Sequence, residues 1–305
     1  MNAWAELEPE YIQAKFADQE AQLIHYRLGR GQRRVLVIAG VHGWEHGGVH
    51  AAYELVNVLA FRSLQGAVDI LPVCNPLAYT AESRETPGNG RNMALSFTAS
   101  PPDDLTAALS HAVLGLAKEA EMVVNLHSAG PARYLTHTIF YRPQDAEFAA
   151  SFGLPFAILP RPLHALEDHI ANRLREDQLM VTLELGGGMV AYREDVTVGV
   201  EAMLSLLAGS GFLSPGDYER CPTPVERIYM HDARLFVRAP SEGAFYAQAS
   251  LGEDLSSGEA FGIWVPINGL QPQTVLAPAD GKLIYVRTRN RASVGQTLAM
   301  FLPPQ

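Results

Sequence analysis

A histidine and a glutamate stand three residues apart in a glycine-flanked turn that follows a short apolar segment. His42 and Glu45 come shortly after the β-branched run 35–38. An imidazole nitrogen and a carboxylate oxygen on one loop can converge on a single cation, and zinc accepts both kinds of ligand. A polar loop that only caps a helix would have the same composition, so this pair alone does not define a zinc site. The chain must supply a third ligand elsewhere.

A second apolar run provides that ligand. Residues 122–126 are apolar apart from Asn125, and His127 follows them directly. With His42 and Glu45, His127 would make a site of two imidazoles and one carboxylate, which leaves a fourth position on zinc for water. Zinc lowers the pKa of such a water towards about 7, and a nearby carboxylate can accept its proton during attack on a carbonyl carbon. The three residues therefore predict a hydrolytic metal site.

Glu184 is the candidate for that proton acceptor. It lies inside the otherwise apolar segment 179–185, where a carboxylate without a partner is costly. We predict that Glu184 acts as a general base and afterwards protonates the departing amine. The alternative is a structural ion pair with an arginine such as Arg173 or Arg193.

The stretch 75–102 is rich in Gly, Pro, Asn and Arg and has no helical or strand periodicity. Connections of this length inside a compact domain are usually functional or disordered. Arg84 lies in this stretch, and we predict that it stabilises the oxyanion of the tetrahedral intermediate. The alternative is a solvated loop arginine, which is the commoner fate of a single arginine.

Alternating strands and helices must position these residues. Such alternation predicts an α/β sandwich around a mostly parallel or mixed sheet, in which ligands bind at the carboxyl ends of the strands. His42, His127 and Glu184 all fall at predicted strand ends. The predicted strands are 22–28, 33–39, 67–74, 122–126 and 179–185, the first two joined as a hairpin, and the predicted helices are 49–59, 102–120, 164–178 and 195–207.

The composition changes at Ser214, where prolines replace helical periodicity, and we predict domains of 1–222 and 223–305. Two stretches of the second domain, 239–259 and 277–296, share an Ala-Pro-x-x-Gly start and a Gly-Glu/Gln end. This spacing predicts a small all-β domain built of two similar halves. Biotinyl or lipoyl carrier function is disfavoured, because neither half has a lysine at the centre of its hairpin. Tyr246 and Tyr285 are candidates to reach the site from this domain.

Composition excludes several classes of protein. The chain has 305 residues, 48% of them hydrophobic, and a formal net charge of −10. It lacks the basic patch that a nucleic-acid surface requires. Two cysteines are too few for a disulfide framework, and no segment has the apolar length of a signal peptide or a membrane span. We therefore expect a cytoplasmic protein without a nucleic-acid or membrane partner.

The order and spacing of these motifs resemble the succinylglutamate desuccinylase/aspartoacylase family, which is related to the zinc carboxypeptidases. The resemblance implies a carboxypeptidase-like three-layer αβα sandwich with a mixed sheet, and a C-terminal β domain that overhangs the site. It also implies one Zn²⁺ per chain, bound by His42, Glu45 and His127, with Glu184 as the catalytic glutamate and Arg84 polarising the substrate carbonyl. The matching segments are His42-Gly43-Trp44-Glu45 with Gly48 (HGxExxG), Asn75-Pro76-Leu77-Ala78 (NPxA), Leu126-His127 (DLH) and Thr182 to Gly186 (ElG).

The chain departs from the family pattern at two places. Asn125 replaces the aspartate of the DLH motif, which affects a contact that orients the ligand histidine. Ala94 and Leu95 occupy the positions of an Asn-Arg pair that holds the substrate carboxylate in the family. Because a guanidinium fork suits a carboxylate, the neighbouring Arg91 could take over this role. We predict Arg91, Asn92 and Asn75 as substrate-binding residues.

The leading hypothesis is a zinc-dependent amidohydrolase that deacylates a small N-acylated amino acid or amine. A carboxypeptidase-like metallopeptidase acting on short peptides is one alternative, and a catalytically weak ligand-binding relative is another. The expected partner is a small-molecule N-acyl substrate. The oligomeric state stays open, although the resemblance favours a homo-oligomer.

Overall fold

The computed structural model describes residues 7–159, 166–214, 217–218, 227–230, 233–269 and 271–304. Its main feature is a nine-stranded mixed sheet. Strand β3 pairs in parallel with β4 and β5, and β5 pairs in parallel with β9, whereas β2 and β7 join the sheet antiparallel to β4 and β9. The predicted mixed sheet is confirmed. In spatial order the strands are β1 (Glu10–Phe16), β2 (Gln19–Gly29), β4 (Ala67–Leu71), β3 (Arg34–Ala39), β5 (Met122–Ser128), β9 (Leu179–Leu185), β7 (His137–Phe140), β8 (Phe156–Leu159) and β10 (Arg227–Met230).

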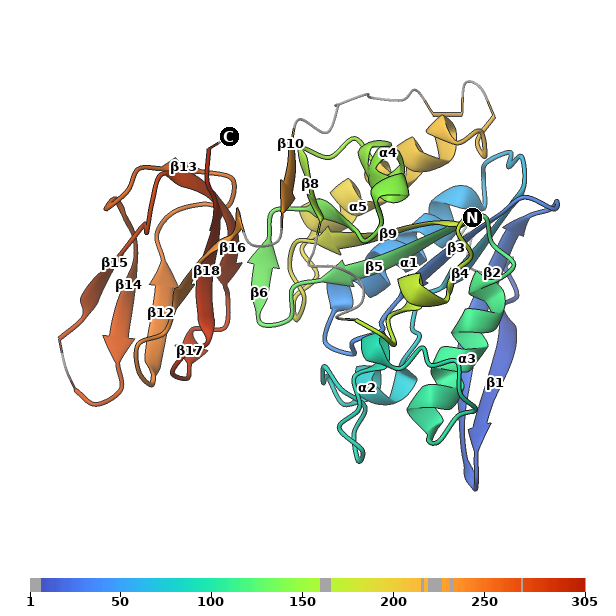
Figure 1. Ribbon diagram of the computed structural model, residues 1–305, viewed down its shortest axis with the longest axis horizontal. Helices are drawn as coiled ribbons and strands as arrows, with labels where there is room; N and C mark the ends of the chain where they lie inside the picture. The colour runs from blue at the N-terminus through green and yellow to red at the C-terminus, as the bar shows by residue number, and fades with distance from the viewer. Residues whose placement is uncertain are drawn as a thin grey trace.

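Helices cover both faces of this sheet (Figure 1). Alternate residues of β3 enter two separate cores, because successive strand side chains point to opposite faces. Val35 and Val37 pack in the core that contains α1 (His46–Leu59), α4 (Ala146–Ala150) and α5 (Arg193–Gly209). Leu36 and Ile38 pack in the core that contains α3 (Leu105–Ala117). This arrangement confirms the three-layer αβα sandwich.

The C-terminal β region, residues 233–269 and 271–304, contains two antiparallel sheets with a core of their own. The strands of the two predicted halves correspond one to one, and β12 and β16 both begin at the glycine of the repeat. The two halves also share a backbone hydrogen bond at equivalent positions. Ala239 N donates to Gln296 O at 2.8 Å, and Ala277 N donates to Glu259 O at 2.8 Å. The two-halves prediction is confirmed. The first sheet is β11 (Leu235–Arg238), β18 (Thr297–Leu302), β16 (Gly281–Arg287) and β13 (Asp254–Leu255), and the second is β15 (Gln273–Leu276), β14 (Ala260–Pro266), β12 (Gly243–Ala247) and β17 (Arg291–Ala292).

The two halves exchange their edge strands. In each sheet the two central strands come from one half and the two outer strands come from the other. Strands β16 and β18 of the second half are flanked by β11 and β13 of the first, and β12 and β14 of the first half are flanked by β15 and β17 of the second. Neither sheet therefore belongs to a single half.

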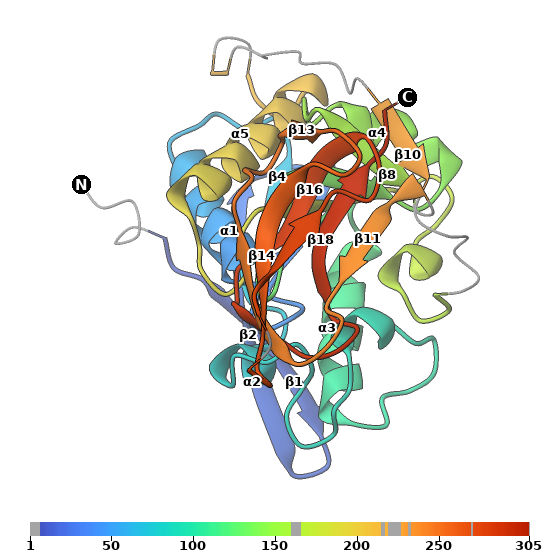
Figure 2. The same ribbon diagram turned by 90° about the vertical axis from the view of Figure 1, so that its left-hand side faces the viewer.

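A short strand joins the C-terminal β region to the α/β part of the molecule. Strand β6 (Ala132–Tyr134) leaves the end of β5 and pairs with β16, so that Tyr134 lies opposite Tyr285. Seen from the C-terminal side, β14, β16 and β18 lie in front of the large sheet (Figure 2). The predicted domain boundary between residues 222 and 223 lies outside the described residues.

Three local predictions differ from the structure. Segments 22–28 and 33–39 do not form a hairpin, because β2 pairs with β1 and β4, while β3 pairs with β4 and β5. The described part of the predicted helix 164–178 contains only the 3₁₀ turn Ile170–Arg173. The predicted strand 67–74 ends at Leu71, before the helix α2 (Pro76–Thr80). Among the helices described, none combines the length and apolar content needed to cross a bilayer.

Candidate metal centre and active site

Three strands bring the predicted site residues to one edge of the large sheet. His42 follows β3, His127 lies near the end of β5, and Glu184 lies near the end of β9, directly opposite His127 in the strand register. Val124 and Leu126 of β5 point into the α1 core, so the next residue, His127, points to the other face. Glu184 shares that face, because register partners on neighbouring strands point the same way.

Close backbone packing fixes the turn that carries His42 and Glu45. Gly43 N donates a 2.8 Å hydrogen bond to Ser83 O, and a Cβ at Gly43 would lie 1.9 Å from the backbone carbon and oxygen of Ala78. A Cβ at Gly48 would lie 2.8 Å from Leu126 O, where α1 crosses β5. The two motif glycines are therefore required by close approach of other backbone, which holds the turn against β5 and α2.

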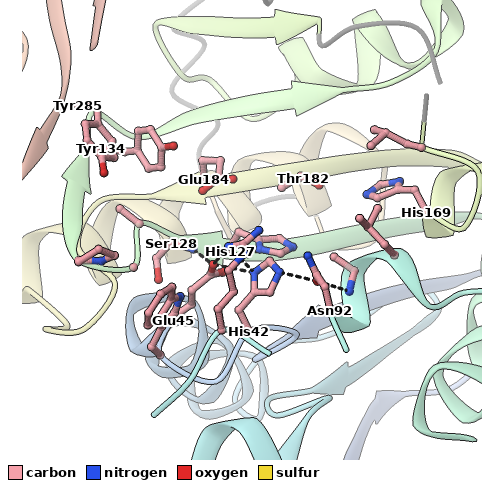
Figure 3. Close-up of a pocket in the computed structure, with 18 of the residues that line it drawn as sticks. His42, Glu45, Asn92, His127, Ser128, Tyr134, His169, Thr182, Glu184 and Tyr285 are labelled. Atoms are coloured by element: carbon pink, nitrogen blue, oxygen red, sulfur yellow. Dashed lines mark hydrogen bonds and ion pairs between the residues drawn. The ribbon is translucent and has the colours of Figure 1, made fainter. Parts of the chain in front are cut away.

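His42, Glu45 and His127 form a buried cluster whose candidate ligand atoms all lie within 4.8 Å of one another (Figure 3). His42 Nδ1 lies 2.7 Å from Glu45 Oε1, and His127 Nδ1 lies 2.8 Å from Glu45 Oε2. Ser128 N donates a 3.2 Å hydrogen bond to the same Oε2. Residues from the turn after β3 and from the end of β5 therefore converge, as the sequence analysis predicts.

A neighbouring asparagine determines which nitrogen of His42 is free to bind a cation. Asn92 Oδ1 accepts the backbone N–H of Ala94 at 3.0 Å, which identifies this atom as the acceptor oxygen. His42 Nε2 lies 3.1 Å from the same oxygen and must carry a proton to bond with it. In the neutral imidazole, Nδ1 then has a lone pair directed at the Glu45 carboxylate. Two such electron-rich atoms 2.7 Å apart require a proton or a cation beside them, so the donor set fits a divalent metal.

The surroundings of Glu45 favour its charged form. Burial alone would raise the pKa of Glu45, but the charges and hydrogen bonds of His42 and His127 hold that pKa well below its usual range. The carboxylate is therefore ionised at neutral pH. It also stands at the N-terminus of α1, where the helix dipole favours negative charge.

A cavity of about 430 Å³ opens beside the cluster, and Glu184 lines it. Burial raises the pKa of Glu184 to about 7; the charge of His127 opposes this rise and that of Glu45 adds to it. A carboxyl group with such a pKa can both accept and release a proton near neutrality. In Figure 3, Glu184 lies across the cavity from Glu45 and His42.

Arg84 lines the same cavity. Its Nη1 lies 3.7 Å from Glu45 Oε1 and 3.5 Å from His42 Nδ1, and 44% of the side chain is exposed. The guanidinium is thus held beside the cluster while most of its N–H donors remain available.

The three residues predicted to bind substrate have different surroundings. Asn92 lines the cavity but bonds to His42, as described above. Arg91 does not line the cavity, because its guanidinium pairs with Asp103 and Asp104. Asn75 is buried away from it, where its side chain caps α2. In this structure Arg91 and Asn75 therefore make structural contacts, and their substrate-binding role stays a prediction.

Sequence reasoning missed a polar wall opposite the C-terminal β region. Tyr141, His169 and Thr182 line the cavity, and the Tyr141 hydroxyl lies 3.0 Å from Thr182 Oγ1. His169 Nδ1 accepts the backbone N–H of Ala171, so the proton is on Nε2. Burial lowers the pKa of His169 to about 3, and the imidazole is neutral. Only Thr182 had a sequence signal, since it precedes Glu184 by two residues and shares its face of the strand.

Tyrosines from the domain junction form the other wall. Tyr134 and Tyr285 line the cavity with ring centroids 5.0 Å apart, which confirms that Tyr285 reaches the site. Tyr246 is half exposed and does not line the cavity, so its predicted approach is wrong. Ala94 and Leu95 do line it, and they place apolar side chains where the family pattern has an Asn-Arg pair.

Together, the fold and the cluster define an α/β-sandwich protein with a two-histidine, one-glutamate metal-site candidate at the carboxyl edge of a mixed sheet. Residues 31–210 match the succinylglutamate desuccinylase/aspartoacylase catalytic domain. The chain belongs to this family.

Comparison with individual proteins agrees. The chain is 26% identical over 276 residues to an N-alpha-acetyl-L-2,4-diaminobutyric acid deacetylase of Halomonas elongata, covering 87% of this chain and 80% of that protein. Its fold is similar to a product-bound structure of the ectoine utilization protein EutE (DoeB) from Ruegeria pomeroyi, with a TM-score of 0.80, 20% identity, and coverage of 98% and 95% of the two chains. It is also similar to a succinylglutamate desuccinylase/aspartoacylase from Rhodobacter sphaeroides, with a TM-score of 0.78, 22% identity, and coverage of 98% and 96%.

Proposed function

We propose that the protein is a zinc-dependent amidohydrolase that removes the acyl group from a small N-acylated amino acid or amine. The observation that carries this proposal is the cluster of His42, Glu45 and His127 facing Glu184 across one cavity. The name of the Halomonas elongata relative, a deacetylase of an N-acetylated amino acid, supports the same substrate class.

We propose one zinc ion per chain, held by His42, Glu45 and His127. Two imidazoles and a carboxylate are a ligand set of catalytic zinc sites. When bound, the ion supplies Lewis acidity, which polarises a carbonyl and lowers the pKa of water. Asn92 orients His42 for this role, because a hydrogen bond to the outer ring nitrogen fixes the tautomer.

Glu184 moves the proton in this mechanism. It accepts a proton from the attacking water as the water oxygen bonds to the amide carbon. It then gives that proton to the amide nitrogen as the C–N bond breaks, so that the products are a carboxylic acid and a free amine. Burial, which raises the pKa of Glu184, helps the carboxyl group to hold the proton between the two steps.

Arg84 and the cavity walls complete the site. Arg84 donates N–H groups to the carbonyl oxygen as negative charge develops on it. The cavity of about 430 Å³ lies in the range of small-molecule sites, which span roughly 300–1,000 Å³. Tyr134 and Tyr285 wall the cavity at the junction with the C-terminal β region. A cavity of this size favours a small N-acyl substrate over the short peptides of the peptidase alternative.

A hydrolysis screen with metal analysis tests the proposal. We expect zinc-loaded protein to release free amine from at least one compound in a panel of N-acetyl, N-succinyl and N-formyl amino acids and amines. A chelator should abolish the activity, and added zinc should restore it. His127→Ala should lose both metal and activity, whereas the exposed His50→Ala, on α1, should keep both. Failure of zinc-loaded protein to hydrolyse any compound, or equal zinc content in the two variants, would refute the proposal and favour the ligand-binding alternative.

A further inference from the structure

A second cavity, of about 220 Å³, lies in the C-terminal β region and is lined by three arginines. Arg287 ends β16, Arg289 is in the following turn, and Arg291 begins β17 (Figure 1). Ser293 and Gln296 complete the lining. Three cations therefore fall within five residues of a chain whose net charge is −10.

Arg287 forms the floor of this cavity. The residue is only 8% exposed, and its Nε donates a 3.0 Å hydrogen bond to Arg291 O. Burial lowers the pKa of Arg287; Tyr285 opposes the change, and the positive charge of Arg289 adds to it. A buried guanidinium beside a like charge is costly unless an anion compensates it.

The described protein residues do not supply that anion. Arg287, Arg289 and Arg291 form no ion pair with any acidic residue in the part of the chain that the structure describes. The carboxylate of Glu242 approaches the cavity lining, but its Oε2 accepts a 3.3 Å hydrogen bond from Ser293 Oγ. The terminal nitrogens of the Arg287 guanidinium therefore remain available to a ligand.

We propose that Arg287, Arg289 and Arg291 form a binding site for a small anion that carries a carboxylate or phosphate group. Guanidinium groups bind the oxygens of such anions through paired, charge-assisted hydrogen bonds. Because the cavity is smaller than the roughly 300 Å³ at which sites for larger ligands begin, it suits a single anionic group. The site is independent of the proposed catalytic residues.

The anion site adjoins the rim of the active-site cavity. Tyr285, which lines the active-site cavity, precedes Arg287 by two residues on β16 and lies on the same side of the strand. Pro131 also lines the active-site cavity, and its carbonyl accepts 3.1 Å hydrogen bonds from Thr288 N and Arg289 N. The anionic group has two sources that fit this position, a carboxylate at the far end of the substrate or a separate free anion.

Calorimetric titration with inorganic phosphate and with succinate tests the site directly. The zinc-loaded enzyme should bind at least one of the two anions, and Arg289→Gln/Arg291→Gln should weaken this binding by about tenfold or more, since charge-assisted hydrogen bonds are lost. These arginines are exposed, so the substitutions spare the core. Arg30→Gln/Arg193→Gln removes the same charge at exposed positions elsewhere and should bind as wild type does. If the anion bound at the catalytic metal instead, the two double variants would bind it with equal affinity. Equal affinities of the two double variants, or no anion binding to the wild type, would overturn the proposal.

Steady-state kinetics then separate the two sources. A Michaelis constant that rises in Arg289→Gln/Arg291→Gln for an N-acyl amino acid, but not for the matching N-acyl amine, assigns the site to the substrate carboxylate. Unchanged Michaelis constants together with lost anion binding assign it to a separate ligand. The kinetic comparison depends on the proposed hydrolase activity, whereas the titration does not.

Discussion

Replacing Glu184 with glutamine distinguishes two properties of its carboxylate: the loss of folding stability caused by its burial, and its role in proton transfer. Burial raises the pKa of Glu184 from 4.5 to about 7. Because the pKa of the folded state is the higher one, the native protein binds more protons between these values, and its stability falls as the pH rises through that window. The difference between the two pKa values, at about 1.4 kcal/mol per pH unit, corresponds to about 3 kcal/mol.

Glutamine carries no charge at any pH, so the stability of Glu184→Gln should not fall in this pH window. Without bound metal, we expect the free energy of unfolding of the variant to exceed that of the wild type by about 3 kcal/mol at pH 8. Below pH 4.5 the difference should disappear, because the wild-type carboxyl is then protonated in both states. Urea unfolding of the two proteins at pH 8 and at a pH below 4.5 measures this difference in the free energy of unfolding. The metal-free protein is required because a bound cation would stabilise the carboxylate.

The same substitution should disable the enzyme. Loss of a positioned general base lowers kcat by about 10²–10⁴-fold, while the zinc content should stay at that of the wild type. The exposed Glu54→Gln serves as a control and should change neither stability nor rate. A stability difference that is the same at both pH values would refute the burial argument. Retention of kcat within about tenfold would remove Glu184 from the proton transfer.

Three further substitutions test contacts that position the metal ligands or stabilise the fold around the site. Asn92→Ala should weaken zinc affinity by about 10–100-fold, because His42 loses the partner that fixes its tautomer; unchanged affinity in a competition titration would contradict this. Gly43→Ala should lower the zinc content sharply, since its Cβ would lie 1.9 Å from backbone atoms of Ala78; metal analysis showing full occupancy would contradict the packing argument. Asp195→Ala should lower the free energy of unfolding by about 2 kcal/mol, because Arg133 keeps only the exposed Glu194 as a partner and the buried Gly187 N–H loses its acceptor; thermal unfolding like that of the wild type would show these contacts to be dispensable.

The sequence was sufficient to predict the centre of the site. The apolar runs 35–38, 122–126 and 179–185 correspond to β3, β5 and β9, and the polar residues at their carboxyl ends are the ones that meet. The reason is geometric, since the carboxyl ends of parallel strands lie at one edge of a sheet. Polar residues that end buried strands are therefore predictable from local pattern.

Residues whose roles depend on distant partners were not predictable. Gln178 belongs to a segment with helical periodicity, yet its buried side chain donates to Ala117 O and Ala120 O near the end of α3, and no helix forms there. Arg91 pairs with acidic residues twelve and thirteen positions further along the chain, a choice that local pattern does not encode. His169 enters the cavity from a segment without a distinctive motif. In each case a tertiary contact overrides or supplements the local signal.

The exchanged outer strands of the C-terminal β region have a consequence for how this part of the protein arose and how it can be dissected. A peptide comprising β11 to β14 alone would lack β15 and β17, which flank β12 and β14. Its strands β11 and β13 would lack the central pair β16 and β18 that they flank. A second copy of the same peptide offers both. One half should therefore be stable only as an intertwined pair, and the C-terminal β region has the architecture of such a pair joined into one chain.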